Sequence, residues 1–76
     1  MKKEAVIEII SDILDLDIDI IDLEASPKEI DEWDSIANVN IIIALEEELK
    51  LKFKLDDLED IKTLNDFVAL ANKYSK

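Results

Sequence analysis

The sequence contains no cysteine, no histidine, no glycine and no arginine, and it has a single proline. Without cysteine the chain can form no disulfide and supplies no thiolate nucleophile or metal ligand. Without histidine it lacks the commonest general base and the commonest metal ligand. We therefore expect a protein that has no catalytic activity of its own.

The length of 76 residues bounds the architecture to one small domain, residues 1–76, without the volume for a deep substrate cavity beside a core. No apolar run approaches the length that crosses a bilayer. Glu4, Glu8 and Asp12 interrupt the segment that an export signal would need to be apolar. We expect a cytoplasmic protein without membrane insertion, and nothing in the sequence argues against a monomer.

Charge is strongly unbalanced, because twenty acidic residues face nine lysines and leave a formal net charge of −11. Nucleic acids and anionic membranes would repel such a surface. Basic patches on partner proteins would be steered toward it. The composition thus favours protein partners and excludes nucleic-acid binding.

The first predicted element is an amphipathic helix over residues 3–16. Acidic side chains occupy one side of it, and apolar side chains recur on the other at the spacing of a helix. The apolar stripe consists of Val6, Ile9, Ile10, Ile13 and Leu14.

A long connection follows over residues 15–33. Its alternation of Asp17, Ile18, Asp19 and Ile20 could indicate a strand, but few other segments could pair with it, and we predict an ordered loop. Ser26-Pro27 predicts a turn or the first residues of a short helical turn. Some of the following residues should pin the loop to the core: Ile18, Ile20, Ile21, Leu23 and Ile30.

The acidic residues of the same connection raise the hypothesis of a calcium site. Asp15, Asp17 and Asp19 match the first ligand positions of an EF-hand loop. The required glycine would fall on Ile20 and the closing glutamate on Ser26, so both conditions fail. We predict no dedicated metal site.

The second predicted helix begins at Asp34-Ser35 and runs to Leu49. Asp and Ser are preferred at helix N-termini, because their oxygens accept hydrogen bonds from unpaired backbone N–H groups. The helix dipole at this point would favour an anion such as a phosphate. The apolar residues that recur at helical spacing are Ile36, Val39, Ile42, Ile43 and Leu49.

The C-terminal third contains an alternating segment and two further helices. Residues 50–55 predict an extended connector that directs Leu51, Phe53 and Leu55 into the core and leaves its lysines in water. Residues 56–60 predict a short helix that starts near Leu55 or Asp56. Without glycine, helix ends must rely on Pro27, Asx-type residues and polar linkers.

A final helix follows, which Thr63 should cap with Asp66 at the reciprocal position. Its apolar stripe is Leu64, Phe67, Val68 and Ala71, and Tyr74 should close the end of the bundle. The predicted fold is all-α: a small bundle of three main helices and one short helix, with a long loop between the first two.

One run resembles the attachment-site helix of acyl carrier proteins and related phosphopantetheine carriers. It reads Glu32-Trp33-Asp34-Ser35-Ile36-Ala37-Asn38-Val39 and continues to Ala44-Leu45-Glu46-Glu47-Glu48-Leu49. In that family an Asp-Ser-Leu motif precedes a helix that commonly ends in Ala-Leu-Glu-Glu-Glu and an apolar residue. The order of the predicted helices also matches, so the resemblance covers nearly the whole chain.

The resemblance implies that Ser35 takes 4′-phosphopantetheine from coenzyme A and that Asp34 belongs to the attachment motif. The arm would carry acyl groups as thioesters to enzymes of fatty-acid, polyketide or specialised lipid or surface-molecule biosynthesis. The implied partners are a phosphopantetheinyl transferase and acyl-transferring, acyl-activating or synthase enzymes with basic docking patches.

The resemblance also implies a partner-binding face on the second helix. The matching residues are Asp34, Ile36, Val39, Ile43, Glu46 and Glu47. Ala37 and Asn40 stand where acidic residues are usual, so contacts near the start of this helix should be less electrostatic.

Two features leave alternatives open. Ile42, Leu45 and Phe67 could line a shelter for an aliphatic chain between the helices, or be plain core. Trp33 stands where many fatty-acid carriers have a small residue, and it could pack beside the arm or anchor the loop against the bundle.

Three other functions remain. The cargo could be an aminoacyl or peptidyl group on the same kind of arm. The chain could instead be an acidic helical adaptor in which Ser35 is only a helix cap. The weakest alternative is a small acidic metal-binding protein.

Overall fold

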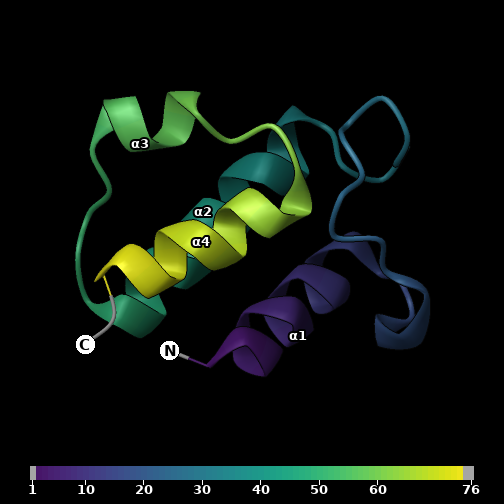
Figure 1. The fold of residues 1–76 in the computed structure, drawn as a ribbon, viewed down its shortest axis with the longest axis horizontal. Helices are drawn as coiled ribbons and strands as arrows, with labels where there is room; N and C mark the ends of the chain where they lie inside the picture. The colour runs from purple at the N-terminus through teal and green to yellow at the C-terminus, as the bar shows by residue number, and fades with distance from the viewer. Residues whose placement is uncertain (1, 75–76) are drawn as a thin grey trace.

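The computed structural model describes residues 2–74, which form four α-helices and one 3₁₀ turn (Figure 1). Residues 2–74 contain no strand, and the predicted all-α class is confirmed. The long connection lies between the first two helices, as predicted. The elements are α1 (Lys3–Leu14), η1 (Ile18–Ile20), α2 (Ser35–Leu49), α3 (Leu55–Glu59) and α4 (Leu64–Tyr74).

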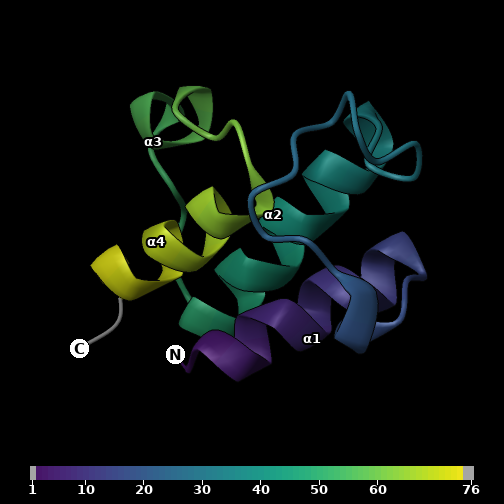
Figure 2. The ribbon, with the colours of Figure 1, turned by 45° about the vertical axis from the view of Figure 1, so that its right-hand side comes forward.

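Three helices, α1, α2 and α4, pack against one another in pairs and enclose the core, while α3 lies at one edge (Figures 1 and 2). Apolar residues spaced three or four apart give each of the three a buried face. Isolated helices of this length are marginal in water, so this mutual burial holds the fold. The core consists of Val6, Ile10, Leu14, Trp33, Ala37, Ile41, Leu45, Phe53, Leu64, Phe67, Val68, Leu70 and Ala71.

Helix α2 buries a face that its apolar pattern did not single out. Ala37, Ile41 and Leu45, four residues apart, face the core. Most of the apolar stripe identified from the sequence lies elsewhere, with Ile36 73% exposed and Val39 51% exposed. The helix has apolar residues on nearly every side, so periodicity located the helix without showing which side is buried.

Helices α1 and α2 both end in a left-handed residue although the chain has no glycine. Asp15 (φ 56°, ψ 43°) and Lys50 (φ 57°, ψ 44°) occupy this conformation. The backbone N–H of Leu16 then donates to the carbonyl of Ser11, and that of Leu51 to Glu46, which are Schellman closures. The first helix therefore ends at Leu14, two residues earlier than predicted.

The connection from Asp15 to Trp33 is ordered, and the prediction that some of its apolar residues pin it to the core is confirmed. Ile21, Leu23 and Ile30 are partly buried against the core. Ile18 and Ile20 are instead exposed on η1, because the 3₁₀ turn directs them outward. Ser26 begins a turn in which its backbone N–H and its hydroxyl both donate to the Glu29 carboxylate, at 3.1 Å each.

Backbone hydrogen bonds fasten this connection to the first turn of α4. The N–H of Asn65 donates to the Leu23 carbonyl at 2.8 Å, and that of Leu64 to the Ala25 carbonyl at 3.3 Å. These N–H groups have no partner inside their own helix, so the connection satisfies donors that would otherwise need water. No local sequence pattern indicates this pairing.

The connector at residues 50–55 follows its predicted alternation except at the end. Phe53 is buried, Leu51 is partly buried, and Lys52 and Lys54 are exposed. Leu55 is 71% exposed, contrary to prediction, because it starts α3 and the extended alternation stops there. The short helix itself is confirmed.

Helix α4 shows the predicted reciprocal capping contact. The Asp66 carboxylate accepts from the backbone N–H groups of Lys62 (2.7 Å) and Thr63 (2.9 Å). Burial opposes ionisation of Asp66, but these hydrogen bonds outweigh it and lower its pKa. At the other end the Tyr74 ring packs on Phe53 with centroids 5.5 Å apart, closing the bundle as expected.

Candidate functional site

At the start of α2 the adjacent residues Asp34 and Ser35 have different structural roles. Asp34 is extended (φ −97°, ψ −174°), and its Oδ1 accepts from the backbone N–H of Ala37 at 2.8 Å. Its carbonyl accepts from Asn38 at 2.9 Å and closes the first helical turn. Asp34 is therefore the N-cap, and Ser35 is the first residue of the helix proper.

Ser35 is exposed, and within residues 2–74 no hydrogen bond engages its hydroxyl. The backbone N–H groups of Ser35 and Ile36 have no partner inside the helix, because they belong to its first turn. The hydroxyl thus lies beside two N–H groups and the positive end of the helix dipole. This environment suits a serine that carries a phosphate ester.

An open depression of about 450 Å³ surrounds this serine. Three separated segments form it, so no single stretch of sequence could indicate its shape. Its lining consists of Pro27, Trp33, Asp34, Ser35, Asn38 and Ile61. Sequence reasoning missed Pro27, Asn38 and Ile61 as components of this site.

Trp33 joins the depression to the core. It is 4% exposed, and its ring lies 5.7 Å from that of Phe67 at an interplanar angle of 51°. Its Nε1–H donates to Oδ1 of Asn38 at 3.0 Å, which ties the end of the connection to the first turns of α2. The anchoring interpretation holds, and the same residue also lines the depression beside Ser35.

The exposed face of α2 carries three large apolar side chains. Ile36, Val39 and Ile43 are 73%, 51% and 46% exposed. Their spacing of three and four residues places them along one side of the helix, leading away from Ser35. They form a continuous apolar stripe in water, a feature typical of a surface that other proteins cover.

Glu46 and Glu47 differ in their surroundings although both stand in the predicted partner face. Glu47 is exposed. The Glu46 side chain is only 13% exposed, and its Oε2 accepts from the backbone N–H of Phe53 at 2.9 Å. Its Oε1 lies 3.9 Å from Nζ of Lys52. Glu46 therefore has an internal role, shaping the connector after α2, that the sequence did not reveal.

Two of the three residues considered as lining for an aliphatic chain are core residues. Leu45 and Phe67 are fully buried, and Ile42 is partly buried against the same core. The core interpretation therefore holds for Leu45 and Phe67.

Residues 2–74 offer neither a candidate metal site nor a candidate membrane span. In that range no group of three or more acidic side chains is arranged to hold a metal ion. None of the helices there combines the length and apolar character that crossing a membrane requires.

Comparison with known families gives a direct result for most of the chain. The family model described as "Phosphopantetheine attachment site" matches residues 4–71. A search of curated protein sequences finds no significant match. The helical fold and the family match together define a phosphopantetheine-dependent carrier.

A solved structure narrows this class. The solution NMR structure of a holo acyl carrier protein from Geobacter metallireducens matches with a TM-score of 0.79 and 33% sequence identity, over 95% of this chain and 83% of that one. This chain belongs to the acyl carrier protein family. Members of the family are non-catalytic carriers, and their cofactor is covalently bound 4′-phosphopantetheine.

Proposed function

We propose that Ser35 is the phosphopantetheine attachment residue and that residues 1–76 act as a single carrier domain for acyl groups. The observation that carries this proposal is the separation of roles at the start of α2. Asp34 caps the helix through Ala37, which leaves the Ser35 hydroxyl exposed and free to react.

The residues around Ser35 fit the cofactor. The N–H groups of Ser35 and Ile36 and the helix dipole favour the negative phosphodiester. Trp33 and Ile61 give the depression apolar surface next to this polar helix start. When bound, the arm supplies the thiol that this cysteine-free chain lacks, and that thiol carries acyl groups as thioesters.

The partners we propose are a phosphopantetheinyl transferase and cytoplasmic acyl-transferring, acyl-activating or synthase enzymes, in fatty-acid or related lipid biosynthesis. Ile36, Val39 and Ile43 would supply apolar contacts, and Asp34 and Glu47 would face basic residues on the enzyme. Glu46 would contribute mainly by holding the connector, since its carboxylate is already engaged.

The similarity to a holo acyl carrier protein favours acyl cargo over aminoacyl or peptidyl cargo. The adaptor hypothesis needs Ser35 as a helix cap, and Asp34 fills that position instead. We therefore retain one proposed function.

The test is the intact mass of the apo protein before and after incubation with coenzyme A and a broad-specificity phosphopantetheinyl transferase. We expect a gain of one phosphopantetheine on the parent protein and none on Ser35→Ala. Ser26→Ala is the matched control, because Ser26 begins a turn in the connection before α2 but lies outside the proposed attachment motif, and this variant should be modified like the parent. Absence of the gain in folded, unmodified parent protein, or its persistence in Ser35→Ala, would overturn the assignment.

A further inference from the structure

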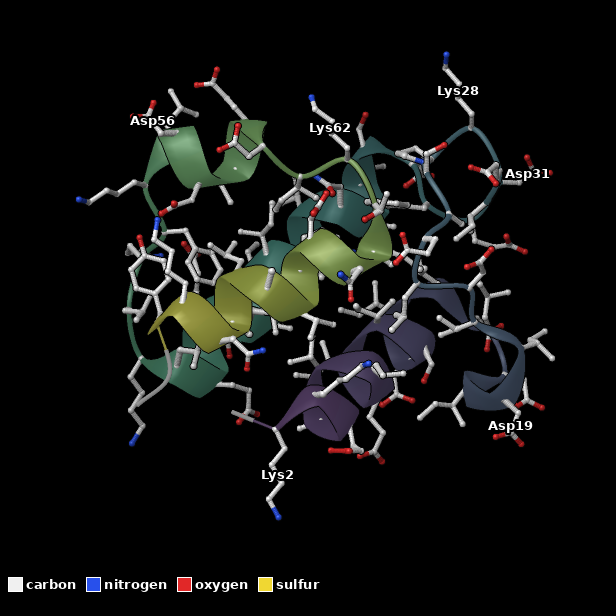
Figure 3. All side chains as sticks on the ribbon, viewed as in Figure 1. Lys2, Asp19, Lys28, Asp31, Asp56 and Lys62 are labelled. Atoms are coloured by element: carbon white, nitrogen blue, oxygen red, sulfur yellow. The ribbon has the colours of Figure 1, made fainter. Side chains whose placement is uncertain are left out.

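The connection between α1 and α2 holds most of the molecule's net charge. Residues 15–34 contain nine of the twenty carboxylates and one of the nine lysines, a net charge of −8 out of −11. In Figure 3, Asp19 and Asp31 project into solvent along one side of the molecule, while Lys28 lies at the far end of the loop from Asp19. This side is therefore acidic over most of its length.

Apolar surface lies within this acidic region. Ile20 is 71% exposed and Ile18 is 44% exposed, both on η1. Beside them is an open depression of about 360 Å³. Its apolar lining is Leu16, Ile20, Ile21, Ala25 and Ile30, and its acidic lining is Asp22, Glu29 and Glu32.

Local hydrogen bonds hold this surface in a defined shape. Oδ1 of Asp17 accepts from the N–H of Asp19, and the Asp17 carbonyl accepts from Ile20, both at 3.0 Å. Oδ1 of Asp22 accepts from the N–H of Glu24 at 3.0 Å. Because the turns are fixed by their own side chains, a partner that binds here would spend little free energy on ordering them.

We propose that this depression, the η1 surface, is a second docking site that takes a basic segment of a partner protein. The segment would place one large apolar side chain in the depression, with lysines or arginines on either side facing Asp22, Glu29 and Glu32. Charge complementarity selects this partner, because the depression is lined by acidic and apolar side chains alone.

The η1 surface shares no lining residue with the depression around Ser35 and none with the apolar stripe of α2. An enzyme acting on the arm could therefore occupy α2 while a basic segment binds at η1. The proposal does not depend on which serine carries the arm, and a Ser35→Ala protein should bind the segment as the parent does.

The probe is a short synthetic peptide of leucine and lysine, with a counterpart in which glutamate replaces every lysine. Isotope-labelled protein is titrated with each peptide at about 0.1 M salt, where charges more than about 10 Å apart are largely screened. We expect the lysine peptide to shift the amide resonances of residues 16–32 most, and the glutamate peptide to shift none. A footprint centred on Ile36, Val39 and Ile43, or spread over all acidic surfaces, would overturn the proposal.

Matched variants separate the apolar contribution. Ile20→Gln should lower the affinity for the lysine peptide by roughly tenfold, since the burial of one large apolar side chain against the peptide is lost. Leu55→Gln removes an equally exposed leucine, also 71% exposed, from α3 on the opposite side of the molecule (Figures 1 and 2). It should leave the affinity within about twofold, because Leu55 lies outside the surface. Equal effects of the two variants would contradict the proposal.

A second pair of variants separates local charge from net charge. Asp19→Asn with Glu32→Gln removes two charges at or beside the η1 surface from carboxylates that do not hold its turns. Glu48→Gln with Glu59→Gln removes two charges from α2 and α3. Only the first pair should reduce binding severalfold, and an equal reduction by both would mean that the peptide responds to net charge alone.

Discussion

Asp34 and Ser35 are adjacent residues with separate roles. Helix-start preference alone made either of them a candidate cap. The structure gives the cap to the carboxylate, which accepts from Ala37, and leaves the serine exposed at the first helical position. The proposed attachment residue therefore has no part in capping the helix, and its substitution should prevent attachment without affecting the fold.

Stability measurements can test this division. Asp34→Ala should lower the free energy of unfolding by about 1 kcal/mol, because the N–H of Ala37 loses its partner. Ser35→Ala should change it by less than about 0.5 kcal/mol, as expected for an exposed residue without a hydrogen bond. Urea denaturation followed by circular dichroism at neutral pH gives both values.

Asp34→Asn serves as the control for this pair, because asparagine also caps helices and should retain most of the stability. If Ser35→Ala costs as much as Asp34→Ala, the serine hydroxyl contributes to the cap and the proposed division is wrong.

At the scale of elements, α3 is joined to α4 by a compact set of polar contacts. Asp57 accepts from Nζ of Lys73 at 2.6 Å and from the hydroxyl of Tyr74. The Tyr74 ring in turn packs on Phe53. Nζ of Lys73 lies 5.5 Å from the centroid of the Tyr74 ring. Since α3 lies outside the three main helix interfaces, this cluster is a principal attachment of the short helix.

The attachment should depend on pH. Hydrogen bonds from Lys73 and Tyr74 lower the pKa of Asp57 below its usual value of 3.8. A carboxyl whose pKa is lower in the folded state contributes stability above its unfolded pKa and loses it as the pH falls through the folded value. The hydrogen bond from the Tyr74 hydroxyl to Asp57 also raises the pKa of Tyr74 above 10.0. The stability that Tyr74 contributes through this bond is therefore present below pH 10 and is lost as the pH rises further.

Asp57→Asn should therefore lower the melting temperature at pH 7 and reduce its decline between about pH 4 and pH 2. Thermal unfolding across this range gives both quantities. Asp56→Asn is the control on the same helix, since Asp56 is exposed and takes no part in the cluster. A decline that is the same in Asp57→Asn and in the parent would show that other carboxylates cause it.

At the scale of the whole molecule, repulsion among the many carboxylates should be the largest electrostatic effect on stability. The net charge of −11 lies on a small core, and residues 15–34 hold −8 of it. Such repulsion destabilises the compact state and is screened by salt. The fold should thus be less stable at low ionic strength than its apolar packing alone would allow.

Raising sodium chloride from about 0.01 M to about 1 M shortens the screening length from about 30 Å to about 3 Å. The melting temperature should rise over this range. The rise should be smaller in the Asp19→Asn and Glu32→Gln double variant, which starts with less repulsion. A melting temperature that does not depend on salt would show that repulsion contributes little.

The sequence by itself determined where the helices lie, that α2 starts at the Asp34-Ser35 pair, and that a long ordered connection precedes it. These features depend on residues near one another in the chain, through capping and apolar periodicity. The family resemblance rested on the same local run and was confirmed over residues 4–71.

Only the tertiary structure decided which side of α2 is buried, that Leu55 faces water, and that Glu46 holds the backbone of Phe53. It also decided that the connection supplies carbonyls to the first turn of α4. The physical reason is that burial and backbone pairing between distant segments depend on how helices meet. When a helix is apolar on nearly every side, as α2 is, its own sequence is consistent with more than one orientation.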